Sequence, residues 1–524
     1  MRIGVDVGGT NTDAALMDGG AVVATAKTAT TRDVGSGVVN AISTVLAEAG
    51  QSPAAIDVVM IGTTHFTNAI VERKGLSRVA VIRLCLPATR SLPPMIDWPE
   101  DLSDIIGEDV YLAKGGYEFD GRLISPLDPE EIAKIADDIA QKGIKDIAIS
   151  SVFAPLNAAM EQGAAEIIKS RLPDANITLS YEIGRIGLLE RENAAIFNAA
   201  LTALADDVVA AFKRALSELE ITAPLYISQN DGTVMSADMV AKFPVHTFAS
   251  GPTNSMRGAA FLCDVKDAIV VDIGGTTTDV GVLIGGFPRQ ASSRVDIGGV
   301  RTNFRMPDVY SIGIGGGSIV SNDGSTRVGP KSVGYRLPLE ARVFGGDVLT
   351  ATDIVVAADC AEIGERAHVR DLDQKLVASA RRYINARVNE AIDCVKTSAA
   401  KVPVILVGGG AVLVTEDLPA ASTTIRPDHA AVANAIGAAI AQVGGEIDKV
   451  YDFDSMGRDA ALDAARAEAR ERAIAAGAEP QSIEIVHVEE IPLAYLPGAV
   501  RVNVKAVGDL AAMAPARAKE VVAQ

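Results

Sequence analysis

The sequence predicts an α/β protein built from two related lobes. A glycine-rich phrase occurs twice, as V-D-V-G-G-T-N-T-D from Val5 to Asp13 and as V-D-I-G-G-T-T-T-D from Val271 to Asp279. Apolar runs typical of strands precede and follow both copies. Strands and helices alternate through most of the remaining chain. Two copies so far apart indicate two lobes that share one local design.

Each copy predicts a strand, a tight turn and a returning strand. Paired glycines let backbone N–H groups approach an anion, and threonine hydroxyls add donors. Two such turns facing each other would clamp a phosphate chain. The candidate phosphate ligands are Gly8, Gly9, Thr10, Asn11 and Thr12 in the first turn, and Gly274, Gly275, Thr276, Thr277 and Thr278 in the second. The aspartates at equal positions, Asp6 and Asp272, are candidates to hold Mg²⁺ through water.

Two further glycine runs belong to the same prediction. Val404 to Val407 reads as a strand that ends in Gly408, Gly409 and Gly410. A glycine strand end lets the backbone lie flat against a planar ring or a sugar, although a tight strand-to-helix connection is the alternative. The run from Gly313 to Ser318 contains Gly315 and Gly316, which we also assign to nucleotide binding.

Composition limits the function classes. The 524 residues are too many for one ordinary core, and 48% apolar with 22% charged residues is a globular composition. A net charge of −19 argues against nucleic acid and against an anionic membrane surface as partners. Four cysteines without close spacing predict neither a zinc ribbon nor a disulfide framework. With no secretory signal and no apolar run of membrane length, we expect a cytoplasmic protein.

The apolar periodicity predicts the element order. We expect a three-stranded meander over residues 1–30 and an irregular segment over 87–128. Glu190 to Asn193 is interpreted as a solvated helix face, although charge near a substrate is the alternative. Helices are expected over 34–48, 129–142, 158–171, 190–219, 430–443 and 459–475. Further strands are expected over 58–61, 79–84, 147–152, 177–180, 225–227, 483–488 and 500–504.

The two phosphate turns followed by a glycine loop resemble the superfamily of actin, sugar kinases and heat-shock chaperone ATPases. The resemblance implies two ribonuclease-H-like lobes around a nucleotide cleft, with small inserted and C-terminal subdomains. It implies ATP and Mg²⁺ as cofactors. It also implies that Asp6 and Asp272 lie near the metal, that both turns bind phosphates, and that Gly408 to Gly410 lie near the adenosine.

Most of the chain also resembles the hydantoinase A/oxoprolinase family. The chain departs from the family pattern in the run from Lys331 to Glu340, and it places His65 and Phe66 beside the first of the matching motifs. These motifs are G-T-T at 62–64, T-N-A at 67–69, E-R-K-G at 72–75, S-Q-N-D-G at 228–232, S-G-P at 250–252, I-G-I-G-G-G-S-I at 312–319, V-G-P at 328–330 and I-P-L-A-Y-L-P at 491–497.

The family resemblance implies a domain division and an activity. It implies an N-terminal lobe over 1–187 with an insert over 87–128, a second lobe over 188–455, and a C-terminal α/β segment over 456–524. The expected activity is ATP-dependent phosphorylation of the carbonyl oxygen of a hydantoin, 5-oxoproline or lactam, which prepares the ring for opening. Since no C-terminal extension follows the late P-L-A-Y-L-P stretch, we expect a separate, hydantoinase B-like hydrolase subunit as partner. A carboxylase subunit, a small-molecule kinase and a nucleotide-gated scaffold are the alternatives.

Several side chains are candidates for catalysis. Asp13 or Asp279 is expected to orient the attacking oxygen. His65, after the glycine-threonine turn, is a candidate base or ligand, with a satisfied structural histidine as the alternative. Other open assignments are Arg301 and Arg305, for a carboxylate or for ordinary salt bridges, and Asp353, for a metal or a helix cap.

Overall fold

The computed structural model describes residues 1–31, 33–291, 294–322, 324–494 and 496–511. The lobe that carries the first glycine turn, called the first lobe below, is built on a nine-stranded sheet in the order β22-β23-β21-β10-β9-β4-β1-β2-β3, which includes strands from beyond residue 187. Its N-terminal strands form the expected meander, with β1 antiparallel to β2 and β2 antiparallel to β3, while β4 lies parallel to β1. The strands are β1 Arg2–Val7, β2 Asn11–Asp18, β3 Ala21–Ala29, β4 Val58–Thr63, β9 Leu225–Ser228, β10 Thr233–Ser236, β21 Gln442–Asp452, β22 Glu484–Pro492 and β23 Ala499–Gly508.

A second sheet repeats this local design. Strand β11 is antiparallel to β12 and parallel to β19, just as β1 is to β2 and β4. Asp6 lies opposite Asp13 in the first hairpin, and Asp272 lies opposite Asp279 in the second. The predicted repeat is therefore present in register as well as in sequence. The sheet consists of β13 Phe287–Pro288, β12 Thr278–Ile284, β11 Ala268–Ile273, β19 Val402–Val407 and β20 Ala421–Ile425, and β16 Val309–Ile312 pairs with β12.

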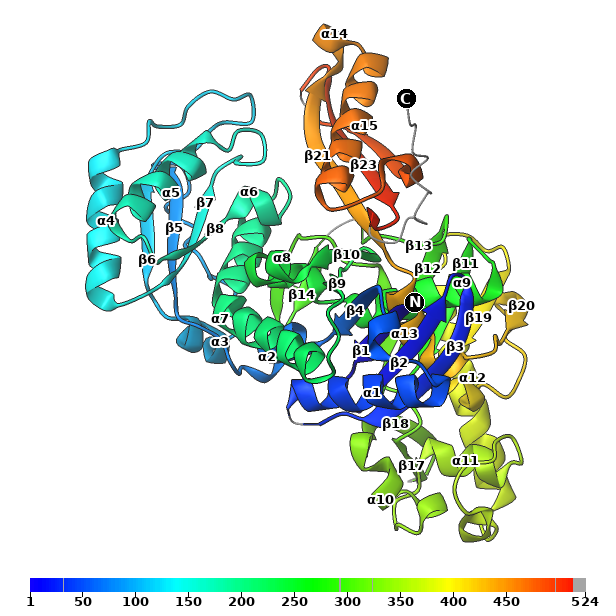
Figure 1. The fold of residues 1–524 in the computed structure, drawn as a ribbon. Coiled ribbons are helices and arrows are strands. Elements are labelled where there is room, and N and C mark those ends of the chain that lie inside the picture. Colours follow the sequence, from blue (N-terminus) through cyan, green and yellow to red (C-terminus); the bar gives the residue numbers. More distant parts are fainter. Residues whose placement is uncertain (32, 292–293, 323, 495, 512–524) are drawn as a thin grey trace, which may run out of the picture.

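A third, four-stranded sheet forms a separate layer in the order β6-β5-β7-β8 (Figure 1). It consists of β5 Val79–Leu86, β6 Val110–Lys114, β7 Asp146–Ser151 and β8 Asn176–Leu179. Helices α4 (Pro129–Lys142) and α5 (Ala159–Arg171) accompany it. The segment 87–128 was expected to be irregular, but it contains helix α3 (Glu100–Ile106) and strand β6.

The remaining helices cover the sheets or connect them. The hydrophobic core of the first lobe lies between the large sheet and helices α1 and α7. The core of the second lobe lies between the second sheet and helices α11 and α12. Helix α7 is long and apolar enough to cross a membrane, but most of its apolar stretch is buried inside the protein. The elements are α1 Val34–Ala49, α2 His65–Glu72, α6 Ser180–Ile183, α7 Leu188–Glu218, α8 Ala237–Lys242, α9 Ser250–Cys263, α10 Leu337–Glu340, α11 Ala351–Ala357, α12 Gln374–Val395, α13 Ala433–Ala439, α14 Phe453–Met456, α15 Arg458–Ala475, β14 Val295–Ile297, β15 Val300–Thr302, β17 Ser318–Asn322 and β18 Thr326–Ser332.

The C-terminal strands correct one helix prediction. A helix was expected over 430–443, but α13 ends at Ala439 and β21 begins at Gln442. Strand β21 pairs with β10 and β23. Its Gly445 contacts helix α15 so closely that a Cβ on this glycine would lie 2.2 Å from the carbonyl oxygen of Ala469. These tertiary contacts override the local helical pattern. Figure 1 shows β21, β23 and α15 together at one end of the molecule. Tyr495 of the late motif lies outside the described residues, as does the end of the expected C-terminal segment.

The charged start of α7 is also different from the prediction. Arg191 and Glu192 are buried instead of solvated. The carboxylate of Glu192 accepts a hydrogen bond from Arg83 Nε at 2.7 Å and one from the Ser150 hydroxyl at 2.6 Å. Because α7 packs on β7 and β5, this face of the helix contacts the buried side chain of Arg83 and is not exposed to solvent.

Removing one charge from this buried pair should strongly destabilise the protein. Glu192→Gln leaves the Arg83 guanidinium buried without a counter-charge, which costs about 3 kcal/mol. The measurement is urea unfolding followed by circular dichroism. Asp137→Asn is the matched control, since its pair with Arg171 is exposed and should contribute less than about 0.5 kcal/mol. Equal effects of the two substitutions would contradict the prediction.

Candidate functional site

The two glycine turns and the Gly408–Gly410 loop line one cleft of about 600 Å³. Asp13 and Asp272 line the same cleft. The other predicted residues do not line the cleft, namely Asp6, Thr12, His65, Thr278, Asp279 and Gly315. The predicted phosphate and adenosine residues that line the cleft are Gly8, Gly9, Thr10, Asn11, Gly274, Gly275, Thr276, Thr277, Gly316, Gly408, Gly409 and Gly410.

The two turns have the same backbone geometry. The amide of Gly8 donates to the Asn11 carbonyl at 3.0 Å, and the amide of Gly274 donates to the Thr277 carbonyl at 2.9 Å. Each turn is thereby closed by one hydrogen bond, with the intervening amides at the tip. Such a curved run of backbone N–H groups is a typical anion-binding concavity.

The glycine run at 313–318 supports the second turn from behind. Gly316 and Gly317 donate their amides to the carbonyls of Gly274 and Gly275 at 3.0 and 2.7 Å. A Cβ on Gly315 would lie 2.5 Å from the Thr276 nitrogen, so only glycine permits this approach. The run therefore shapes the turn, and Gly316 also reaches the cleft.

Asp6 lies buried at the base of the first turn, with 5% of its surface exposed. The side-chain amides of Asn254 and Asn434 donate to its two oxygens at 3.3 and 3.0 Å. Burial, followed by the nearby charge of Asp13, raises the pKa of Asp6 to about 6. This carboxyl group therefore changes its protonation state close to neutral pH.

Asp272 occupies the equivalent place in the second turn and is partly exposed to the cleft. Burial raises the pKa of Asp272 to about 7, with smaller contributions from Asp279 and Asp6, while a hydrogen bond from Ser255 opposes the shift. Gly408 passes so close that a Cβ there would lie 2.3 Å from the Asp272 carboxylate, and its φ is +84°. Glycine is required at Gly408 on both grounds.

The second aspartates of the two hairpins have different surroundings. Asp13 pairs with Lys27 at 2.7 and 2.9 Å and accepts a hydrogen bond from Asn434 at 2.9 Å. Asp279 accepts a hydrogen bond from the Ser311 hydroxyl at 2.5 Å, and burial raises the pKa of Asp279. Asp13 lines the cleft beside a lysine, whereas Asp279 does not line it.

His65 begins helix α2 beside the cleft. Its Nδ1 lies 2.7 Å from the Thr63 hydroxyl, and desolvation lowers its pKa. Its neighbours Thr64 and Asn68 line the cleft. The histidine therefore has a local hydrogen-bond partner, and its catalytic role stays a prediction.

Two of the open assignments are resolved geometrically. Asp353 accepts hydrogen bonds from the Thr350 and Val343 amides at 2.6 and 2.7 Å, which completes a capping box at the start of α11. Arg301 lies 3.5 Å from the exposed carboxylate of Asp97. Arg305 lines a different cavity, described below.

Sequence reasoning missed four polar residues around the aspartates, namely Lys27, Asn254, Ser255 and Asn434. The register of the meander could have found Lys27, because it lies directly opposite Asp13 on β3. Asn434 interrupts an otherwise apolar segment, which is a local signal for a buried polar role. Asn254 and Ser255 carry no such signal.

The acidic pair is suited to a hydrated Mg²⁺ and not to a protein cage. Among the described residues, no group of three or more His, Cys, Asp or Glu side chains could hold a metal ion. Mg²⁺ usually keeps several waters and binds one or two carboxylates together with substrate phosphates. Asp6 and Asp272, at the bases of the two glycine turns, fit this donor set.

The two matched hairpins around a cleft define the class of fold. The protein is a mixed α/β protein in which two sheets carry matching glycine hairpins, and its third sheet and C-terminal strands add to them. Two family models also match the sequence. The model for the hydantoinase/oxoprolinase N-terminal region matches residues 2–172, and the model for hydantoinase/oxoprolinase matches residues 191–380. The chain belongs to the hydantoinase/oxoprolinase family.

Two curated relatives are 27–28% identical to this chain over the aligned residues. The caprolactamase subunit alpha of Pseudomonas jessenii is 28% identical over 379 residues, which are 68% of this chain and 54% of the relative. The acetophenone carboxylase gamma subunit of Aromatoleum aromaticum is 27% identical over 395 residues, 67% of this chain and 52% of the relative. The chain thus spans about half the length of these relatives.

Solved structures share the fold over nearly the whole chain. The ATP-dependent caprolactamase of Pseudomonas jessenii aligns with a TM-score of 0.78 at 19% identity, covering 97% of this chain and 87% of the other. Nucleotide-free acetone carboxylase aligns with a TM-score of 0.69 at 18% identity, covering 97% and 88%.

The raised pKa values predict proton release when Mg²⁺ and a nucleotide bind. A divalent cation favours ionised carboxylates, so binding at pH 6 must displace protons from Asp6 and Asp272, whose pKa values are about 6 and about 7. The affinity should therefore rise between pH 5.5 and 7.5, by up to about tenfold per pH unit for each group. Calorimetry in buffers of different ionisation enthalpy measures the released protons, and a pH-independent affinity would contradict the assignment.

The same carboxyl groups predict how the free protein responds to pH. Because the pKa of Asp272 is raised from 3.8 to about 7, the native state holds more protons than the unfolded state within this window. Its stability should fall as the pH rises from about 4 to 7. Asp272→Asn should stabilise the ligand-free protein at pH 8 by about 1 kcal/mol, allowing for partial exposure. Thermal melting at pH 5 and pH 8 checks this.

Proposed function

We propose that this chain uses ATP to phosphorylate, and so activate, the carbonyl oxygen of a cyclic amide for ring opening. The observation that supports the proposal best is the pair of matched glycine turns on one cleft, each with a buried or half-buried aspartate, in a member of the hydantoinase/oxoprolinase family. The substrate class is a hydantoin, 5-oxoproline or a lactam.

The chemistry explains the need for ATP. The carbonyl of a lactam or hydantoin is stabilised by resonance with its ring nitrogen and is a poor electrophile. Transfer of the γ-phosphoryl group to the carbonyl oxygen gives an O-phosphorylated imidate and ADP. Water can then attack the carbon and the C–N bond breaks, with the ring nitrogen leaving as the amine. This leaves an acyl phosphate, and a second water releases inorganic phosphate and the carboxylate. Positioning and charge neutralisation account for most of the catalysis in such transfers.

Each element of the cleft has a role in this proposal. The backbone amides of the two turns hold the β- and γ-phosphates, with threonine hydroxyls as added donors. Lys27 lies at the cleft beside Asp13 and supplies positive charge. Asp6 and Asp272 would hold Mg²⁺, which neutralises phosphate charge when bound. Asp13 would orient the attacking oxygen, since it lines the cleft and Asp279 does not.

The hydrolytic step is proposed to need a second subunit. Two curated relatives are named as the alpha and gamma subunits of their enzymes, and this chain spans about half the length of each. We therefore propose a hydantoinase B-like partner that completes ring opening. The complex would work in the cytoplasm.

A carboxylase subunit is the second candidate. The similarity to the acetophenone carboxylase gamma subunit is nearly as high as that to the caprolactamase subunit, and it covers the same share of this chain. The same cleft would then phosphorylate an enolate oxygen or bicarbonate, and the reaction would require bicarbonate.

Phosphate release separates these candidates. The chain should release phosphate from ATP and Mg²⁺ faster when a hydantoin, 5-oxoproline or a lactam is added, and faster again with the co-expressed neighbouring gene product. Mass spectrometry should then detect the ring-opened acid. Stimulation by ketones that depends on bicarbonate would favour the carboxylase instead. Phosphate release that no cyclic amide accelerates, with or without a partner, would contradict the proposal.

The two equivalent aspartates should differ in catalysis. Asp13→Asn should lower kcat at least about a hundredfold, because it removes the group that orients the attacking oxygen. Asp279→Asn is the matched control on the other hairpin and should lower kcat less than tenfold. Nucleotide affinity, measured by calorimetry, should change little in either variant. A larger loss of kcat in Asp279→Asn would reverse the assignment.

A further inference from the structure

A second cavity, of about 530 Å³, lies apart from the cleft, and no described residue lines both. Its walls come from the turn after α6, the loop Gln229–Asp231, the segment Asn303–Arg305 and strands β21 and β23. The loop belongs to the S-Q-N-D-G motif, which the proposed phosphoryl transfer does not use. The cavity therefore needs an explanation of its own.

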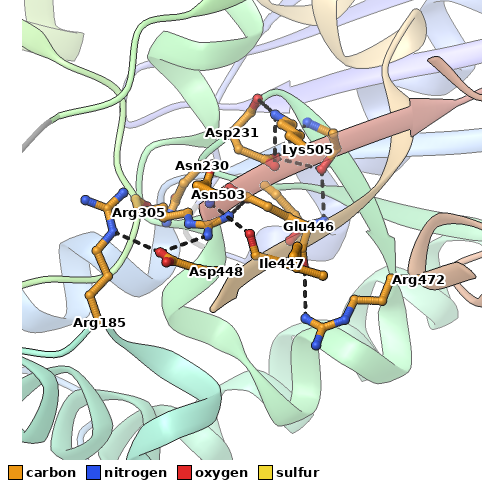
Figure 2. Close-up of polar contacts among 12 residues, drawn as sticks. Arg185, Asn230, Asp231, Arg305, Glu446, Ile447, Asp448, Arg472, Asn503 and Lys505 are labelled. Carbon is orange, nitrogen blue, oxygen red and sulfur yellow. Dashed lines mark hydrogen bonds and ion pairs between the residues drawn. The ribbon is translucent and has the colours of Figure 1, made fainter. Parts of the chain in front are cut away.

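Three arginines converge on the carboxylate of Asp448 in this cavity (Figure 2 labels two of them). Arg501 forms a bidentate pair, with its Nε 2.6 Å from Oδ1 and its Nη2 2.5 Å from Oδ2. Arg305 lies 3.4 Å from the same Oδ2 and also pairs with Glu446. Arg185 points at Asp448 with its Nε 4.0 Å from Oδ2, too far for a hydrogen bond.

Arg185 makes the longest polar contacts of these three arginines among the described residues. Its Nε is buried and has no hydrogen-bond partner among the described residues. Its Nη1 makes a long contact of 3.5 Å with the Ala291 carbonyl. A buried Nε–H without an acceptor is costly, because that atom has lost its water and gained no hydrogen bond in return, while the Arg185 side chain as a whole is 21% exposed.

The charges that line the cavity leave a positive excess. Three guanidiniums face the two carboxylates of Glu446 and Asp448. The exposed Glu489, which is not part of the lining, also acts on Arg185 and Arg501. The other acidic residues of the wall already have partners, since Asp231 pairs with Lys505 at 3.0 Å and Glu182 with Lys242 at 3.4 Å. Two further basic residues of the wall, Lys449 and Arg472, share the single carboxylate of Glu468. This excess is unusual in a chain of net charge −19.

Burial makes this excess energetically significant. Desolvation lowers the pKa of Arg185, and it lowers the pKa of Arg305 to about 10. Desolvation also lowers the pKa of His246 to about 4, so this wall residue is neutral at pH 7 and adds no charge. A bound anion would supply the missing acceptor and the missing counter-charge together.

The shape of the wall selects the kind of anion. A planar guanidinium fork matches a carboxylate or a phosphate, so the rest of the lining decides between them. Apolar side chains complete the lining and suit a short carbon chain, namely Ile183, Ile186, Phe304 and Val450. A cavity of about 530 Å³ is within the usual size for a small-molecule site.

We infer that this cavity binds a small organic carboxylate, with Arg185 as its principal donor and Arg305 and Arg501 beside it. One part of the inference rests on the proposed function. Ring opening breaks the C–N bond and adds the oxygen of water to the carbonyl carbon, so the product of a lactam is an amino carboxylate of this class. The presence of the site itself does not depend on that reaction.

Calorimetry on the full chain without nucleotide tests the site. The probes are butyrate, 6-aminohexanoate, the neutral analogue butyramide and inorganic phosphate. We expect saturable binding of at least one carboxylate, no binding of butyramide, and weaker binding of phosphate. Arg185→Ala should weaken carboxylate binding at least about tenfold, the value of one charge-assisted hydrogen bond.

The matched control is Arg171→Ala. Arg171 forms an exposed ion pair with Asp137 and does not line this cavity, so this variant should bind the carboxylates as the unmodified chain does. Equal melting temperatures of the two variants would show that Arg185→Ala is folded. Three results would overturn the inference: no saturable heat from either carboxylate up to about 20 mM, unchanged affinity in Arg185→Ala, or tighter binding of phosphate. Because no ATP or cyclic amide is present, failure of the proposed phosphoryl transfer would leave this result unaffected.

Discussion

The close contact between helices α9 and α13 is the constraint on which the cleft depends. A Cβ on Gly258 would lie 1.9 Å from the Ala433 carbonyl oxygen, and a Cβ on Gly437 would lie 1.8 Å from that of Asn254. The helices can therefore touch backbone to backbone only because both positions are glycine. This contact brings Asn254 of α9 and Asn434 of α13 to the same carboxylate, Asp6, from two sides. The position of that acid is therefore fixed by helix packing as well as by its own strand.

The two hairpins have the same backbone arrangement, but the side chains around their aspartates differ. Both turns share the same closing hydrogen bond and the same cross-strand pair of aspartates. In the first pair Asp13 forms an ion pair with Lys27, and Asn434 donates to both aspartates, whereas the second pair is contacted by the hydroxyls of Ser255 and Ser311. A duplicated backbone can thus hold a phosphate chain at both ends, while its two carboxylate pairs have different charge and different access to the cleft.

The sequence was most informative where local rules decide the structure. Helix α4 begins at Pro129 as predicted, because the Asp128 side chain caps it and Glu130 and Glu131 follow in the first turn. The glycine turns were equally predictable, since few other conformations suit a repeated G-G-T after an apolar strand. Prediction failed where a distant segment decides. The sequence around Glu192 does not predict that the distant Arg83 will pair with it. The sequence around Gln442 likewise does not predict the strands that pair with β21.

Helix α9 links the two cavities through consecutive residues. The Thr253 hydroxyl donates to the backbone carbonyl of Asn230 in the S-Q-N-D-G loop at 3.0 Å, and the next residue, Asn254, donates to Asp6. Asn230 in turn accepts the Ala249 amide at the start of the same helix and donates to the carbonyl of Arg305. A loop of the arginine-lined cavity and an acid of the cleft are thus fixed to one rigid helix. Since well-packed helices move as units, a displacement of that loop would also displace the support of Asp6.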